Sequence, residues 1–310
     1  MALNLAASGE ACPGVESSER HDAAPLRQRR RLPVTAVVVL YHPDAAAIRE
    51  GILARLGGAV DIVLVDNTPA EDASPADWSP ARYIPLGRNT GIARAQNVGI
   101  EAARRAGSDY VLLLDQDNVM DVDTVASLVA SFERLERQGH APAVVAPVAV
   151  DTETGRVFRP LSHDIEGRFA AVADAHAAGS LLSLNAIEAV GPMREALFID
   201  LVDQDWCWRA GARGFGIFVD GEARVAQTLG RRTRFVLGRR FAEPAEERWY
   251  YIVRNALFLL RQPYAPWVWK GGFFLSLPLK VAAFLLLYRR RRVFLRSLLR
   301  GFAEGWRLPA

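Results

Sequence analysis

The sequence is poor in the residues that define several classes of protein. It has only two cysteines, Cys12 and Cys207, which are far apart; this excludes a disulfide scaffold and indicates a reducing compartment. Neither has histidine or cysteine neighbours at the spacing of a zinc site. With 24 glycines and 17 prolines in 310 residues, the chain is neither collagen-like nor of low complexity. Residues 1–19 lack the positive start and long apolar run of a secretory signal.

Net charge is also small, at +3, but it is unevenly distributed. From Arg231 onward there are 17 Lys and Arg against 4 acids, a balance of +13, so the first 230 residues carry −10. An acidic body with a basic tail indicates an anionic partner for the tail: a membrane surface, nucleic acid or a phosphorylated ligand. No recognisable nucleic-acid-binding module accompanies the charge, so we expect no nucleic acid partner.

Apolar runs alternate with helical patterns from Val34 onward. Strands are expected at 34–40, 61–66, 82–86, 110–115 and 143–147, with helices at 45–56, 92–106 and 122–138. This alternation predicts βαβ units and therefore an α/β fold with a mostly parallel central sheet and flanking helices. In such sheets the ligand lies at the carboxyl ends of the strands.

The second half is less regular. A strand is expected at 179–184, a short helix at 185–190 with Asn185 and Glu188 at capping-box spacing, a helix at 203–212, a closing pair of strands at 216–220 and 223–227, and a helix at 245–261. We expect residues 1–33 to form a disordered leader, 34–262 the α/β domain and 263–310 a C-terminal helical segment that associates with a membrane.

The C-terminal segment contains the longest apolar run, residues 267–288. Lys270, Pro278 and Lys280 interrupt it, whereas a spanning helix needs about 20 residues with few or no charges. Flanking tryptophans and the arginines at 289–292 favour a helix in the membrane interface, attracted to anionic headgroups. A spanning helix and an ordinary buried helix remain the alternatives.

Three segments carry residues suited to chemistry. In LLLDQDN (112–118), a buried strand delivers Asp115 and Asp117 to its carboxyl end, and two carboxylates on one side of a loop can hold a divalent cation and, through it, a diphosphate. RNTGIARAQNVGI (88–100) places small residues, amides and cations at the start of a helix, where an anion is favoured. FIDLVDQDWCWR (198–209) opens a further helix with three aspartates.

Together with VVVLYHPD (37–44), LVDN (64–67), GSLLS (179–183) and YYIVRN (250–255), these segments resemble glycosyltransferase family 2, whose members are inverting enzymes of the GT-A type. The similarity runs from about Val34 to about Arg261 and is greatest to bacterial rhamnosyltransferases. It implies transfer of a sugar, first of all L-rhamnose from dTDP-rhamnose, to a lipid-linked or polysaccharide acceptor. It also implies a cytoplasmic protein, peripheral on the inner face of the cell membrane; the oligomeric state stays open.

The resemblance also implies roles for individual residues. Asp115 and Asp117, with Gln227, hold Mg²⁺ or Mn²⁺, and Asp203 is the general base, a role that Asp205 or Asp200 can share. Acceptor-binding residues are Gly179, Ser180 and Trp206, with His176 as a further candidate. The donor is bound by a larger set: Tyr41, Asp66, Arg88, Asn89, Gly91, Asn97, Asp115 and Arg231.

Two departures from the family pattern keep other functions open. The family often has Glu where Val202 stands and His where Gln227 stands, and an amide oxygen binds metal less well than imidazole does. A UDP-hexose-dependent transferase is therefore one alternative. A membrane-docked protein that binds a nucleotide-sugar or a partner transferase without catalysis is the other.

Overall fold

The computed structural model describes residues 31–73, 76–151, 167–227, 233–236, 239–242, 245–288 and 290–308. The expected leader lies almost entirely outside these residues, as do Arg231 and Arg289. The compact unit that begins at Arg31 contains all the described elements, and they are described within that unit.

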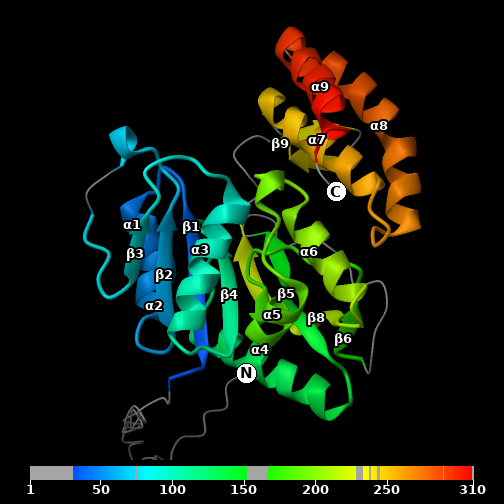
Figure 1. Cartoon of the computed structure of the whole chain (residues 1–310). Helices are drawn as coiled ribbons and strands as arrows, with labels where there is room; N and C mark the ends of the chain where they lie inside the picture. Colours follow the sequence, from blue (N-terminus) through cyan, green and yellow to red (C-terminus); the bar gives the residue numbers. More distant parts are fainter. Residues whose placement is uncertain are drawn as a thin grey trace, which may run out of the picture. The chain divides into compact units, whose positions relative to one another are not determined.

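A mixed sheet forms the centre of this unit (Figure 1). Its strands, in spatial order, are β3 (Arg82–Pro85), β2 (Asp61–Asp66), β1 (Val34–Leu40), β4 (Tyr110–Asp115), β7 (Leu181–Ser183), β5 (Pro142–Asp151), β8 (Gly216–Gln227) and β6 (Phe169–Ala171). The pairs β3–β2, β2–β1, β1–β4 and β5–β8 are parallel, whereas β7 and β6 run antiparallel to their neighbours. The expected α/β fold with a mostly parallel sheet is thus confirmed.

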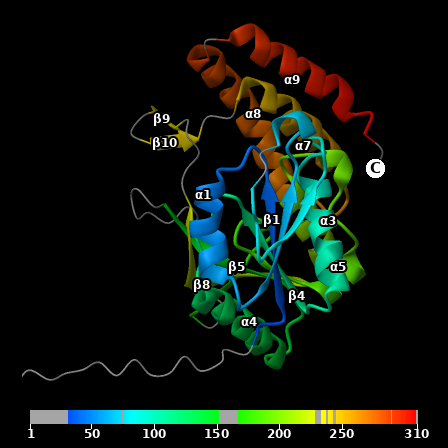
Figure 2. The ribbon, with the colours of Figure 1, turned by 90° about the vertical axis from the view of Figure 1, so that its left-hand side faces the viewer.

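Helices cover both faces of the sheet, because the central strands are apolar on both sides. One face packs against α3 (Ile92–Arg105), α5 (Leu184–Val190) and α6 (Val202–Gly211). The other packs against the segment Ala45–Leu56 (α1 and α2, joined by a π-helical turn) and against α4 (Val122–Arg137). Figure 2 shows α1 on one side of β1 and α3 and α5 on the other.

The strand register brings the carboxyl ends of β1, β2 and β4 to one edge. Leu40 pairs with Asp66, and Val39 pairs with Asp115. The two strand-ending aspartates therefore lie at the same edge of the sheet, on either side of β1. This is the edge at which parallel sheets bind ligands.

Several local expectations were wrong. The expected closing pair of strands is one long strand, β8, which pairs with β5 along its whole length. The short strand β6 was not foreseen, and it pairs with residues 218–220 in the first half of β8. Helix α5 is capped by Ser183, whose Oγ accepts a hydrogen bond from the backbone N–H of Ala186, so the expected cap at Asn185 is not used.

The C-terminal part contains a two-stranded ribbon, β9 (Thr233–Val236) and β10 (Arg239–Ala242), and then three helices. These are α7 (Trp249–Leu260), α8 (Trp267–Leu287) and α9 (Arg291–Gly305), which share an apolar cluster around Trp249, Tyr288 and Phe294. Among the described residues, one helical stretch, Trp267–Leu286, is long and apolar enough to cross a membrane. Of its most apolar 18-residue segment, 6% is buried within the protein. The alternative of an ordinary buried helix is therefore wrong.

Candidate active site

Three aspartates come together beyond the carboxyl end of β4. Asp115 ends β4, Asp117 follows in the next turn, and Asp203 lies in the first turn of α6. Burial, and after it the negative charges of Asp117 and Asp203, raise the pKa of Asp115 to about 6. The structure thus brings the expected metal-binding pair and the expected base into one electrostatic site.

The chemistry of this pair fits a divalent cation. In the described part of the chain no other residue donates a hydrogen bond to the carboxylates of Asp115 and Asp117, and burial also raises the pKa of Asp117. Among the described residues, no group of three or more His, Cys, Asp or Glu side chains is placed to hold a metal ion. Mg²⁺ is typically held by one or two carboxylates together with substrate phosphates and waters. The two aspartates fit that mode of binding.

The turn after β4 is fixed by two residues that the sequence analysis did not single out. Asn118 is buried, and its Oδ1 accepts a hydrogen bond of 2.8 Å from the backbone N–H of Asp115. The side-chain amide of Gln116 makes two hydrogen bonds with the backbone of Tyr41. Its Oε1 accepts from the N–H at 2.9 Å, and its Nε2 donates to the carbonyl at 3.3 Å. Gln116 therefore joins the loop after β1 to the aspartate turn.

Asp203 has a histidine partner. His176 Nδ1 lies 3.3 Å from Asp203 Oδ2, and the Asp203 side chain is 22% exposed, so it is accessible to a ligand. Ser180 is buried and donates its hydroxyl to the carbonyl of His176, while Gly179 takes a positive φ of 80° beside Pro147. Gly179 and Ser180 thus hold the turn that carries His176, and the expected direct contact of Ser180 with an acceptor is not what the structure provides.

The two other acids near Asp203 are already neutralised. Asp200 accepts a bidentate ion pair from Arg248, with its shortest N–O distance 2.7 Å. Asp205 is fully buried and accepts from Arg209 Nε at 2.9 Å and from the Tyr264 hydroxyl at 2.7 Å. A carboxylate engaged in this way is structural, so the expected catalytic role for Asp205 is not supported by its position.

Asp66, which the resemblance assigns to the donor, is a buried hub between two loops. Its Oδ1 accepts the backbone N–H of Thr68 at 2.9 Å, and its Oδ2 accepts the hydroxyl of Tyr83 at 2.6 Å. Burial and this bond raise the pKa of Tyr83 to about 12. Thr68 in turn accepts the backbone N–H of His42 at 2.8 Å. Asp66 therefore orders the two loops that follow β1 and β2.

Asparagines connect these loops to the segment before α3. Asn67 donates to Asn89 Oδ1 at 3.1 Å and accepts the backbone N–H of Thr90 at 2.7 Å. Gly91 has a φ of 85°, and a Cβ at this position would lie 2.6 Å from Phe198. Only glycine fits here, so the positive φ of Gly91 and the bonds of Asn89 fix the course of the segment before α3.

The start of α3 is not an open anion site, contrary to expectation. The carbonyl of Phe198 accepts the N–H of Ile92 at 2.7 Å and that of Ala93 at 3.4 Å, which uses the donors that an anion needs. Asn97 faces elsewhere, since its amide bonds the backbone of Met193 in both directions. Its expected role in donor binding is therefore replaced by a structural one.

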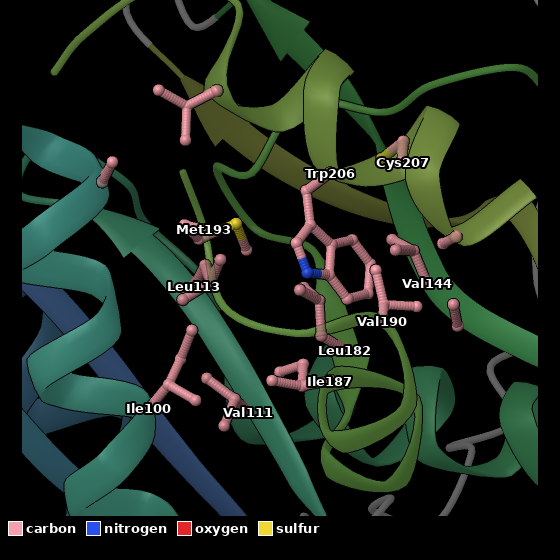
Figure 3. Close-up of a cluster of buried hydrophobic side chains, with 14 of the residues drawn as sticks. Ile100, Val111, Leu113, Val144, Leu182, Ile187, Val190, Met193, Trp206 and Cys207 are labelled. Carbon is pink, nitrogen blue, oxygen red and sulfur yellow. The ribbon is translucent and has the colours of Figure 1, made fainter. Parts of the chain in front are cut away.

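Trp206 belongs to the hydrophobic core. Its side chain is 1% exposed and packs among Leu113, Val144, Leu182 and other apolar residues (Figure 3). Its Nε1 donates to the carbonyl of Gly191 at 2.9 Å. A ring buried in this way does not stack on a sugar, so the expected acceptor contact is wrong.

The remaining expected donor and metal residues lie on loops or outside the described side chains. Tyr41 follows β1 and is 45% exposed, and Arg88 is exposed in the loop between β3 and α3. Gln227 is the last residue of β8, but its side chain lies outside the described residues. Arg231 also lies outside them.

A mostly parallel sheet covered on both faces, with an Asp-x-Asp turn and a further aspartate at its carboxyl edge, has the architecture of GT-A nucleotide-sugar transferases. Residues 37–185 match the family model "Glycosyl transferase family 2". The chain is 27% identical over 246 residues to the dTDP-rhamnosyl transferase RfbF of Shigella flexneri, covering 75% of this chain and 81% of RfbF. Residues 37–185 are therefore similar to glycosyltransferase family 2, and most of the chain is similar to a dTDP-rhamnosyl transferase.

Two further curated relatives act in glycan biosynthesis by their names. The succinoglycan biosynthesis protein ExoO of Rhizobium meliloti (strain 1021) is 34% identical over 134 residues, 40% of this chain and 36% of ExoO. The low-salt glycan biosynthesis hexosyltransferase Agl10 of Haloferax volcanii is 20% identical over 65% of this chain and 68% of Agl10. The crystal structure of S. aureus TarS aligns with a TM-score of 0.46 and 13% identity, over 74% of this chain and 40% of that one. Together with the family model and RfbF, the hexosyltransferase Agl10 supports glycosyltransferase activity in general.

Proposed function

We propose that the chain is an inverting rhamnosyltransferase that transfers L-rhamnose from dTDP-rhamnose to a polysaccharide or lipid-linked acceptor. The observation that carries this proposal is Asp203, a partly exposed carboxylate in the same site as the Asp115–Asp117 pair. The similarity to RfbF over most of both chains supports the choice of donor.

In the proposed reaction, Asp203 takes the proton of the acceptor hydroxyl while that oxygen attacks the anomeric carbon from the side opposite the leaving group. The bond between the anomeric carbon and the diphosphate oxygen breaks in the same step, which inverts the configuration. His176, 3.3 Å from Asp203, orients this carboxylate. Asp115 and Asp117 would hold Mg²⁺ or Mn²⁺, which supplies positive charge to the departing diphosphate.

We also propose that α8 and α9 attach the protein to the inner face of the cell membrane. Large side chains of α8 are exposed, including Trp267 (82%), Val268 (90%) and Leu275 (78%). The exposed Arg290–Arg292 and Arg296 lie close by in the sequence, and anionic headgroups attract arginines. This arrangement favours a partly inserted interfacial helix, because Lys280 is also exposed and Pro278 lies inside the helix.

A panel of nucleotide sugars tests the donor. Purified full-length chain is incubated with Mg²⁺ or Mn²⁺ and with dTDP-rhamnose, UDP-glucose or UDP-galactose, with and without lipid-linked acceptor, and nucleoside diphosphate release is followed. Acceptor-dependent release of dTDP alone supports the proposal, and release of UDP alone supports the hexosyltransferase alternative. Donor binding without release from any sugar supports the non-catalytic alternative and overturns the proposal.

The substitution Asp203→Asn tests the base. It keeps the size of the side chain but removes its basicity, and a positioned base contributes about 10²- to 10⁴-fold to rate. We expect turnover to fall by at least about 100-fold, while dTDP affinity, measured by calorimetry, changes little. Asp72→Asn, an exposed acid in the 3₁₀ turn Ala70–Asp72, is the matched control. A fully active Asp203→Asn variant would contradict the assignment of Asp203 as the base.

A further inference from the structure

The loop that leads into the proposed base has an unusual backbone. Phe198, Asp200 and Leu201 all have positive φ, at 66°, 64° and 63°, although none is glycine. Left-handed conformations of such residues cost about 1–2 kcal/mol each and persist only when the surroundings impose them. Helix α6 begins directly after this loop and has no side-chain cap. The direction of its first turn, and so of Asp203, therefore depends on whatever holds the loop.

What holds the loop is mainly α7, through Asn255. This residue is fully buried, and its Nδ2 donates to three loop carbonyls, those of Leu197, Ile199 and Asp200, at 2.7–2.8 Å. An amide nitrogen has two hydrogens, so at least one is shared. One side chain thus fixes the orientation of three peptide groups in a run of four residues.

Two arginines add to this attachment. Arg254, next to Asn255, donates to the carbonyls of Ala196 and Leu197 at 2.8 Å each. Arg248, in the 3₁₀ turn before α7, makes the bidentate pair with Asp200, and its charge also acts on Asp115. The loop is therefore held along its length by one face of α7 and the turn that precedes it.

We propose that Arg248, Arg254 and Asn255 are positioning residues for catalysis, which hold the 196–201 loop so that Asp203 faces the acceptor. Among the described residues, no hydrogen bond or ion pair joins any of the three to Asp203. The inference rests on the proposed role of Asp203 as base. It assigns to the C-terminal helix α7 a function in the chemical step, beside its packing against α9.

A matched pair of substitutions on α7 separates positioning from general stability. Arg254 and Arg261 lie seven residues apart on the same helix, both are partly buried, and both donate to backbone carbonyls. Arg261 bonds the carbonyls of Gly305, Trp306 and Leu308 at the end of α9, away from the loop. Arg254→Gln and Arg261→Gln therefore remove similar interactions, the first from the middle of α7 and the second from the residue that ends it.

We expect Arg254→Gln to lower kcat by about tenfold or more, because a displacement of about 1 Å at a reacting group has effects of this size. The KM for the donor and the affinity for dTDP should stay within about twofold, since the donor-side loops are untouched. Arg261→Gln should keep wild-type kcat. Hydrogen–deuterium exchange of peptides covering 196–205 should speed up in Arg254→Gln and not in Arg261→Gln.

The outcomes are distinguishable. If the wild-type protein is active and Arg254→Gln and Arg261→Gln have the same kcat, the positioning role is overturned. The proposed function is then left intact. A wild-type protein inactive with every donor would overturn the proposed function and the positioning role in catalysis together. Unchanged exchange in Arg254→Gln would show that Arg254 does not hold the loop, whatever the activity.

Discussion

Single aspartates in one short stretch of sequence have different environments, and the environment decides what each can do. Asp200, Asp203 and Asp205 lie within six residues, yet Arg248 neutralises the first and Arg209 neutralises the last. Among the residues that the structure describes, Asp203 has the neutral backbone N–H of Gln204 and the imidazole of His176 within bonding distance, and no arginine or lysine pairs with it. Proton transfer needs an accessible carboxylate, so Asp203 is the one suited to it.

The substitution Asp205→Asn tests the structural role of its neighbour. It leaves Arg209 without its buried counter-charge and weakens the bond to Tyr264, whose pKa is raised by burial and by Asp205. Removing one partner of a buried ion pair is costly, so we expect the free energy of unfolding to fall by about 2–4 kcal/mol. Urea denaturation measures this loss.

The same variant separates the two aspartates functionally. Its turnover, corrected for the folded fraction, should fall far less than that of Asp203→Asn, because Asp205 is fully buried. A loss of turnover as large as that of Asp203→Asn, with unfolding unchanged, would contradict this assignment and restore Asp205 as a catalytic residue.

At the scale of elements, α8 differs from the other helices because both of its sides are apolar. One side packs through Leu277, Val281 and Phe284 into the cluster shared with α7 and α9. The opposite side exposes Leu275 (78%), Leu279 (74%) and Leu286 (78%). An exposed row of large apolar side chains along a whole helix is unfavourable in water, and the bilayer interface relieves that cost.

Two glutamates on the exposed side of α8 test this. Each exposed leucine that enters an apolar phase contributes about 1.5–3 kcal/mol, so Leu275→Glu with Leu279→Glu should weaken binding to phosphatidylglycerol vesicles by at least about tenfold. The matched control, Ala46→Glu with Ala47→Glu, adds the same charge at exposed positions in the first turn of α1. Vesicle co-sedimentation measures both, and equal binding of the two double variants would contradict membrane attachment through α8.

Most elements of the first half were predictable, because each central strand is a continuous apolar run and each helix has its own periodicity. The strands at 34–40, 61–66 and 110–115 have the expected bounds. The pair of strands expected at 216–227 was wrong because the break between 220 and 223 is a bulge in one strand paired with β5. The positions of the site acids that end strands could be predicted from the sequence. The structural roles of Trp206 and Asn97 could not, because they depend on contacts between distant segments that no local pattern encodes.

At the scale of the molecule, the arginines of the basic C-terminal part have different environments. Arg248 and Arg254 are directed inward to the loop before α6, and Arg261 joins α7 to the end of α9. Arg290–Arg292 and Arg296 are exposed. Among the described residues, Lys280 and Arg307 are exposed as well, so these side chains and Arg290–Arg292 with Arg296 can meet an anionic surface, whereas Arg248, Arg254 and Arg261 are engaged within the fold.

The acidic part of the chain contains an ion pair that ties the sheet edge to a helix and makes global stability depend on pH. Asp220 of β8 is fully buried, accepts from Arg168 at 2.7 Å and from Ser131 of α4 at 2.7 Å, and its pKa is lowered because these bonds outweigh the cost of burial. In an unfolded chain the pKa of Asp is about 3.9. The folded state therefore gains stability from the ionised form.

The sign of the effect follows from linkage. Because the folded pKa lies below the unfolded one, this stabilisation is fully present above about pH 5 and is lost as the pH falls through the folded pKa. We expect Asp220→Asn to lower the free energy of unfolding by about 2 kcal/mol at pH 7, and the difference from wild type to shrink below about pH 4. Urea denaturation between pH 3 and 7 measures both quantities. The control is Glu133→Gln, which breaks an exposed ion pair with Arg137 on α4 and should lower the free energy of unfolding by less than about 1 kcal/mol. If the difference between Asp220→Asn and the wild type grew as the pH fell, the assignment would be contradicted.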